Sequence, residues 1–265
     1  MLPEIGFGTN ELRGDAGVET VRLALEAGYR HLDTARMYEN EREVGRAVAE
    51  SDVPREDVVV ATKVLPEALG HDDLVASARE SADRLGVDTI DLLYVHWPMD
   101  AYDPDETLPA LDELVAEGLV DHVGLSNFTP DLLDEARARL DAPVAAHQVE
   151  MHPLLPQDEL LAYADEHGHR LVAYCPLVRN EVTDVPEVVD VAERRGVTPA
   201  QASIAWVMAK GAVPIPRSGS PEHVRANLAA ADVELTDEDV ARIDAIDPSR
   251  HRRLVDPDGA AWNRE

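Results

Sequence analysis

Short apolar runs alternate along the chain with longer segments whose apolar residues recur at helical spacing. The runs are typical of buried strands and cover residues 4–9, 29–34, 57–64, 89–97, 121–127, 144–151, 169–177 and 212–216. The segments that follow them have the period of amphipathic helices and cover residues 16–28, 40–51, 71–86, 104–120, 129–140, 156–168, 199–211 and 220–231. The pattern therefore predicts eight strand–helix units, with a further helix at 236–246 and a short tail.

Strands that are separated by helices pair in parallel through right-handed crossovers. Eight such units in a chain of 265 residues fit the size of a (β/α)8 barrel, or TIM barrel. A doubly wound sheet is the competing architecture, but the G-x-G-x-x-G turn that marks it is absent. No low-complexity linker interrupts the pattern, so we interpret residues 1–265 as a single α/β domain.

The composition indicates an enzyme-sized globular domain. Hydrophobic residues make up 45% of the chain, and no apolar run approaches the ~18 residues that suggest a membrane span. The opening residues lack the basic region and apolar stretch of a secretory signal. The single cysteine, Cys175, excludes an internal disulfide and a cysteine metal cluster. We therefore expect a cytoplasmic protein.

The charge of the chain is strongly negative. Acidic residues number 53, and only two of the 24 basic residues are lysines, Lys63 and Lys210, so the net charge is −29. Such a surface repels nucleic acids and anionic membranes. It also repels itself at low ionic strength, whereas molar salt shortens the Debye length to ~3 Å. The composition favours a protein of a very salty cytoplasm, and an ordinary acidic protein is the alternative.

Four chemically capable side chains fall at the ends of successive predicted strands. The second strand ends at Asp33, with Tyr38 in the loop behind it, the third ends at Lys63 and the fourth at His96. Barrel enzymes build their active sites at this edge of the sheet. The sequence therefore predicts an active site that contains these four residues.

Their chemistry suggests proton transfer to a carbonyl. A free tyrosine, with a pKa near ~10, is a poor acid at neutral pH, and the ammonium of Lys63 would lower the pKa of Tyr38. A buried lysine keeps its charge only beside a carboxylate, which Asp33 provides. His96 can hydrogen-bond the substrate oxygen. The competing interpretation is a buried Asp–Lys pair that only stabilises the strand ends.

These motifs resemble the aldo-keto reductase superfamily over nearly the whole chain. The most specific match is "GYRHLDTARMYENEREVG" at 28–45, and "VATKV" and "LLYVHWP" match the segments that carry the family's lysine and histidine. The resemblance implies Asp33, Tyr38, Lys63 and His96 as a catalytic tetrad, with Tyr38 as the acid. It also implies hydride transfer from a nicotinamide cofactor bound without a Rossmann fold.

The same resemblance assigns residues to the cofactor. Ser126, Asn127 and Gln148 are expected to hold the nicotinamide carboxamide, Tyr174 to stack on the ring, and Leu177 to lie near the pyrophosphate. The segment "PIPRSGSPEHVRANL" resembles the family's adenosine-phosphate site. Its expected cofactor residues are Arg217, Ser218, His223, Arg225 and Asn227. We expect NADP(H) to be preferred, with NAD(H) as an alternative.

Two departures from the family bear on the substrate. Asn10 stands where an aromatic residue is usual, and the loop after His96 is short, with Trp97 left as a pocket wall. A short-looped, less aromatic pocket predicts small polar substrates. The chain most resembles the prokaryotic branch that contains 2,5-diketo-gluconate and methylglyoxal reductases.

Two other functions compete with carbonyl reduction. A cofactor-binding regulatory subunit would not need an intact tetrad. An isomerase or a metal-dependent hydrolase would keep the barrel, but Lys63 in the middle of the predicted site would repel a metal ion, so we expect no metal. For the assembly we expect a monomer, with a dimer as the alternative.

Overall fold

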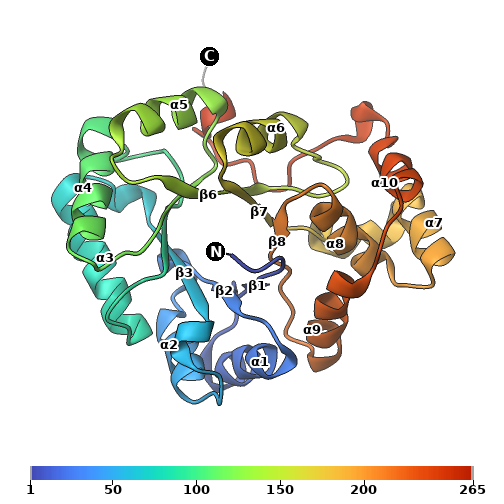
Figure 1. Cartoon of the computed structure of the whole chain (residues 1–265), viewed down its shortest axis with the longest axis horizontal. Helices are drawn as coiled ribbons and strands as arrows, with labels where there is room; N and C mark the ends of the chain where they lie inside the picture. The colour runs from blue at the N-terminus through green and yellow to red at the C-terminus, as the bar shows by residue number, and fades with distance from the viewer. Residues whose placement is uncertain (1, 264–265) are drawn as a thin grey trace.

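The computed structural model describes residues 2–263. Within these residues eight strands form one sheet in sequence order, and every neighbouring pair is parallel. The strands are β1 (Phe7–Gly8), β2 (His31–Asp33), β3 (Val59–Val64), β4 (Leu92–Val95), β5 (Val123–Ser126), β6 (Val144–Glu150), β7 (Arg170–Tyr174) and β8 (Val213–Pro214). Figure 1 shows them at the centre of the molecule, with helices around them.

Backbone hydrogen bonds also join the first and last segments of the sheet. Gly6 N donates to Pro214 O at 2.9 Å, and Gly8 N donates to Pro216 O at 3.2 Å. The sheet therefore closes on itself, and the predicted (β/α)8 barrel is confirmed. Several strands are shorter than the apolar runs predicted, because only part of each run is paired with a neighbouring strand.

Each crossover contains a helix packed on the outside of the barrel. The helices are α1 (Gly14–Ala27), α2 (Glu41–Ala49), α3 (His71–Leu85), α4 (Pro104–Ala116), α5 (Pro130–Arg139), α6 (Asp158–His167), α7 (Pro186–Arg195), α8 (Pro199–Ala209), α9 (Pro221–Leu228) and α10 (Asp237–Asp244). The sequence pattern missed α7, which packs against α8 and α10 (Figure 1). The predicted helix after the last unit is α10.

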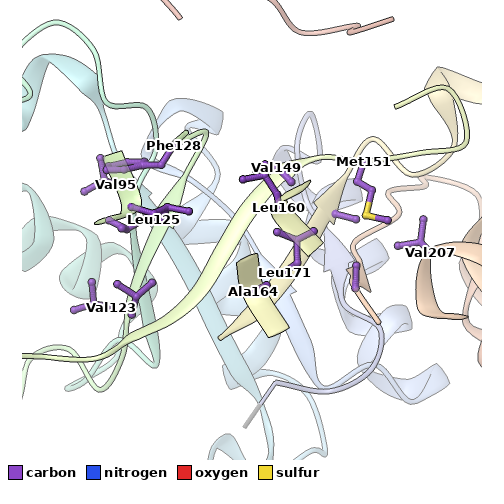
Figure 2. Close-up of a cluster of buried hydrophobic side chains, with 14 of the residues drawn as sticks. Val95, Val123, Leu125, Phe128, Val149, Met151, Leu160, Ala164, Leu171 and Val207 are labelled. Carbon is purple, nitrogen blue, oxygen red and sulfur yellow. The ribbon is translucent and has the colours of Figure 1, made fainter. Parts of the chain in front are cut away.

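The largest apolar core lies between the strands and the helices. Figure 2 shows part of it: Val95 of β4 and Leu125 of β5 lie with Phe128, and Val149 of β6 lies near Leu160 of α6. These side chains are at most 8% exposed. Because strand residues alternate between faces, the intervening positions point to the opposite side of the sheet.

That opposite side is the packed interior of the barrel. It contains a separate apolar cluster in which Leu92 and Tyr94 of β4 meet Ala146, Val172 and residues of the neighbouring strands. The Tyr94 ring fills space beside Gly124, where an added Cβ would lie 2.4 Å from Tyr94 Cδ1. The interior is therefore closed by side chains, and chemistry is confined to the ends of the strands.

In the part of the chain described, no helix is long and apolar enough to cross a bilayer.

Candidate active site

Asp33 and Lys63 form a buried ion pair where β2 and β3 end. Parallel pairing sets Asp33 beside Ala61, so Lys63, two residues further along β3, reaches the same edge. Lys63 Nζ lies 2.5 Å from Asp33 Oδ1 and donates to Thr34 O at 2.9 Å, and Asp33 and Lys63 are each 1% exposed. Burial would lower the pKa of Lys63, but Asp33 and Tyr38 outweigh it and raise that pKa. Lys63 is therefore held as an ammonium.

Tyr38 approaches this ammonium from the loop after β2. It ends the short 3-10 helix η1 (Arg36–Tyr38), is half-buried, and its ring centroid lies 5.2 Å from Lys63 Nζ. Burial raises the pKa of Tyr38, and the nearby Lys63 charge opposes that rise without cancelling it. Lys63 therefore lowers the pKa of Tyr38 as expected, but burial outweighs this influence and the pKa lies above its usual value. The phenol keeps its proton at neutral pH.

His96 completes the group from the end of β4. Its ring meets the Tyr38 ring edge-on, with 6.2 Å between centroids, and the residue is 7% exposed. Burial, together with the Lys63 charge, holds the pKa of His96 well below its usual value. A neutral imidazole can donate an N–H to a substrate oxygen without carrying charge into the site. The structure thus brings the four predicted tetrad residues together.

A second polar cluster lies at the ends of β5, β6 and β7. Ser126 Oγ donates to Gln148 O at 2.9 Å, and Asn127 Nδ2 donates to Ser126 Oγ at 3.0 Å. Tyr174 Oη donates to Asn127 Oδ1 at 2.9 Å. Ser126, Asn127 and Gln148 are at most 2% exposed, whereas Tyr174 is half-buried. Four of the predicted cofactor residues therefore form one hydrogen-bonded group.

Two hydrogen bonds connect this cluster to the tetrad. Gln148 Nε2 donates to Asp33 Oδ2 at 2.7 Å, and Asn127 Nδ2 donates to His96 O at 3.0 Å. Asn127 has a left-handed backbone, with φ 64°, a conformation that asparagine tolerates better than most residues. The tetrad and the predicted nicotinamide residues are thus joined in one hydrogen-bonded network.

The loop after β7 has an unusual backbone. Cys175 and Val178 have φ of 53° and 51°, and for a β-branched valine this region is strained. Between them lies Leu177, which is half-buried at the start of η4 (Val178–Asp184). Burial raises the pKa of the Cys175 thiol to about 11, so it stays protonated and unreactive. Strain of this kind concentrates at functional loops.

The predicted phosphate residues follow β8. Arg217 is exposed, and its guanidinium forms an ion pair with Glu11 from the loop after β1. The sequence pattern missed this partner, because nothing in the spacing of the two residues indicates that the first and last strands are neighbours until the barrel is closed.

The other predicted phosphate residues belong to α9 and the turn before it. Ser218 Oγ accepts from Ser220 N at 3.0 Å, and Ser220 caps the helix. His223 and Arg225 are exposed, and Arg225 donates to the carbonyl of Pro221 at 3.3 Å. Asn227 is 5% exposed. The start of α9 therefore has a helix N-terminus with cationic side chains nearby, a combination that attracts phosphate.

The two residues expected to line a substrate pocket lie in different surroundings. Asn10 is exposed in the turn after β1. Trp97 is 7% exposed because Trp262, near the end of the chain, packs on it with 5.5 Å between ring centroids. Nothing in the sequence pattern indicates that Trp262 lies beside Trp97.

No group of three or more His, Cys, Asp or Glu side chains within residues 2–263 converges so that it could hold a metal ion.

Comparison with known proteins gives consistent matches over the whole barrel. The model of the Aldo/keto reductase family matches residues 4–248. Methylglyoxal reductase DkgB of Escherichia coli O157:H7 is 38% identical over 263 residues, covering 98% of each chain. The 2,5-diketo-D-gluconic acid reductase B of Corynebacterium sp. is 40% identical over 257 residues, covering 96% of this chain and 92% of that protein.

Solved structures agree in fold. The aldo-keto reductase MGS-M4 from a Medee basin deep-sea metagenome library superposes with a TM-score of 0.91 at 32% identity, covering 97% of this chain and 94% of that one. A Bombyx mori aldo-keto reductase in complex with NADP superposes with a TM-score of 0.88 at 27% identity, covering 96% and 92%. The chain therefore belongs to the aldo/keto reductase family and is an oxidoreductase.

Proposed function

We propose that this enzyme reduces small aldehydes, ketones or sugar carbonyls to alcohols, with NADPH preferred over NADH as hydride donor. The observation that carries the proposal is that Asp33, Tyr38, Lys63 and His96 meet at the strand ends. In this group a protonated phenol lies beside both a fixed ammonium and a neutral imidazole. The names of the bacterial relatives, reductases of methylglyoxal and of a diketo acid, support the same reaction class.

The residues at the ends of β5 to β8 fit a nicotinamide dinucleotide. Ser126, Asn127 and Gln148 present fixed hydroxyl and amide groups beside the tetrad, which suit a carboxamide. Tyr174, whose hydroxyl is held by Asn127, offers an aromatic ring for stacking. Arg217 and the start of α9 suit phosphate groups. When bound there, the cofactor supplies the hydride.

The side chains of the tetrad act on the carbonyl oxygen. His96 donates a hydrogen bond to this oxygen and orients the carbonyl. Tyr38 transfers its proton to the same oxygen while the carbonyl carbon gains the hydride, so the product is the alcohol. The ammonium of Lys63 stabilises the phenolate that Tyr38 becomes, and Asp33 keeps Lys63 charged and in position.

We also infer that the enzyme works in concentrated salt. The charge of −29 is carried on a surface where many arginines pair with exposed acids, such as Arg13 with Glu39 at 3.2 Å and Arg79 with Glu117 at 2.7 Å. Pairs of this kind add little stability by themselves. Screening of the remaining acids at molar KCl removes most of the self-repulsion.

The test is a spectrophotometric assay of NADPH oxidation in molar KCl against a panel that includes methylglyoxal, glyceraldehyde and a keto acid. We expect oxidation that depends on the carbonyl compound and disappears in Tyr38→Phe. Absence of turnover with both NADPH and NADH across the panel, by protein that is folded in the same buffer, would refute carbonyl reduction. Binding of NADPH without turnover would instead favour a regulatory subunit.

A further inference from the structure

A buried carboxylate fixes the C-terminal segment (residues 252–263) over the end of β6. Glu150 is fully buried and accepts from Leu254 N at 2.6 Å and from Val255 N at 2.9 Å. His152 Nε2 lies 2.8 Å from the same carboxylate. Charge-assisted hydrogen bonds of this length are strong when water is excluded. They hold the backbone immediately after Arg253 in one place.

The side chain of Arg253 lies on an aromatic stack beside the tetrad. Its guanidinium carbon is 3.9 Å from the centroid of the Trp262 ring, a cation–π contact. Trp262 Nε1 donates to Asp256 Oδ1 at 2.9 Å, and the Trp262 ring packs on Trp97, the residue that follows His96. The cation therefore lies on a fixed aromatic pair, one member of which, Trp97, adjoins His96 in the chain.

Within residues 2–263 Arg253 forms no ion pair with a carboxylate, unlike the arginines near it in sequence. Arg250 pairs with Glu187 at 2.7 Å, and Arg252 pairs with Glu181. Among the described residues no acidic oxygen lies within ion-pair distance of Arg253, although this chain carries 53 acids. Asp256 lies nearby, and its Oδ1 accepts from Trp262 and Asn263. These two hydrogen bonds, together with the Arg253 charge, hold the pKa of Asp256 below its usual value.

The field of Arg253 reaches the predicted nicotinamide end of the site. Burial raises the pKa of Tyr174 well above its usual value, and the Arg253 charge is among the influences that oppose this rise. A chain of charge −29 repels anions at long range. An anionic substrate therefore needs a local cation, and a guanidinium held on an indole face is suited to bind a carboxylate through two hydrogen bonds.

We propose that Arg253 binds the carboxylate of the substrate, so that the enzyme prefers carbonyl compounds that carry an acid group to uncharged ones of the same size. The proposal rests on the proposed function and names the substrate class of the same site. Arg253 acts as a specificity-determining residue: it adds binding energy to the acid end of the molecule and takes no part in hydride or proton transfer.

The experiment compares succinic semialdehyde with its methyl ester, which has the same carbonyl without the charge. In Arg253→Gln the KM for succinic semialdehyde should rise about 10-fold or more, the usual effect of losing a hydrogen bond to a charged group. The kcat and the KM for the ester should stay within about 2-fold. Arg253→Lys should restore part of the loss. The matched control is Arg252→Gln, which removes the neighbouring charge and should leave the preference for the acid unchanged.

Equal changes for the acid and the ester in Arg253→Gln would overturn the proposal, because they would indicate a packing role only. A loss of preference in Arg252→Gln as large as in Arg253→Gln would also overturn it, because any charge would then suffice. A second measurement does not depend on turnover: succinate is titrated against the protein while tryptophan fluorescence is recorded, since Arg253 lies on Trp262.

The succinate titration tests carboxylate binding by Arg253 independently of carbonyl reduction. If neither aldehyde is reduced, carbonyl reduction fails, and the titration alone decides the role of Arg253. A succinate-dependent change in wild type that is lost in Arg253→Gln retains the carboxylate site. The same response in both proteins, or no response in either, overturns it.

Discussion

The charged side chains at the two ends of the site differ in exposure: those of the reacting end (Asp33, Lys63) are buried, and those of the phosphate end (Arg217, Glu11) are exposed. At the reacting end, Asp33 and Lys63 are 1% exposed and share hydrogen bonds with the backbone and with Gln148. At the phosphate end, the side chains of Arg217 and Glu11 are 40% and 68% exposed and form an ion pair with each other. Buried charges are little affected by salt, whereas exposed pairs are screened. The reacting end is therefore preorganised, and the phosphate end responds to ionic strength.

The largest expected effect is at the reacting end. Tyr38→Phe removes the proton donor but keeps the ring against Lys63, so kcat should fall by roughly 100-fold or more, the scale of general acid catalysis. Binding of NADPH, followed by protein fluorescence, should remain within about 2-fold of wild type. The control is Tyr163→Phe on α6, whose hydroxyl donates to Asp134 at 2.6 Å outside the site. Near-wild-type turnover of Tyr38→Phe would refute the assignment.

The second largest expected effect is that of salt on the melting temperature, through the exposed acidic surface. Raising KCl from dilute to molar screens the repulsion among acids, so the melting temperature should rise by about 5 °C or more. The kcat of folded enzyme should change little, because the tetrad charges are buried. Thermal melts and initial rates in the same buffers measure both. A melting temperature that is flat across the series would remove the basis for a high-salt protein.

The group of Asp33, Tyr38, Lys63 and His96 could be predicted from sequence because each of its residues lies at the carboxyl end of a strand or in the loop that follows it. Once the alternation of strands and helices indicates a barrel, the residues after successive strands must meet at one edge. Asp33, Lys63 and His96 are therefore neighbours whatever the loops do. Tyr38 could be placed at the same edge because its loop follows β2 directly, and the family resemblance added its role as the acid.

Other contacts at the site could not be predicted in this way. Glu11 and Arg217 are brought together only by closure of the first strand on the last, and Trp262 reaches Trp97 through a segment without helical or strand period. The pKa of Tyr38 is raised because the ring is buried, and the sequence does not indicate how deeply it is buried.

The missed helix α7 has a different cause. Its signals are present, with Pro186 at the first helical position and Gly196 at the end. The crossover between β7 and β8, however, holds two helices in succession where one was expected.

At the phosphate end, Arg217→Ala should weaken NADPH selectively. If the guanidinium binds the 2′-phosphate, its loss should raise the KM for NADPH by about 10-fold in dilute salt and leave the KM for NADH nearly unchanged. In molar KCl the difference between the two cofactors should shrink, because the contact is exposed. Initial rates with each cofactor, at both salt concentrations, measure this. Equal losses with NADPH and NADH would show that Arg217 does not distinguish the 2′-phosphate.

The smallest expected effect comes from the partner of that arginine. Glu11 occupies the guanidinium of Arg217 and adds negative charge beside the expected phosphate, so Glu11→Gln should lower the KM for NADPH by about 3-fold in dilute salt. The KM for NADH should not change. The matched control is Glu39→Gln, which removes one exposed acid that pairs with Arg13 and leaves Arg217 untouched. A similar decrease in the control would mean that the total charge of the chain sets the affinity. An increase in the KM for NADPH in Glu11→Gln would instead mean that Glu11 positions Arg217 for the phosphate. Only a decrease confined to NADPH and to Glu11→Gln identifies the pair as a competitor of the cofactor.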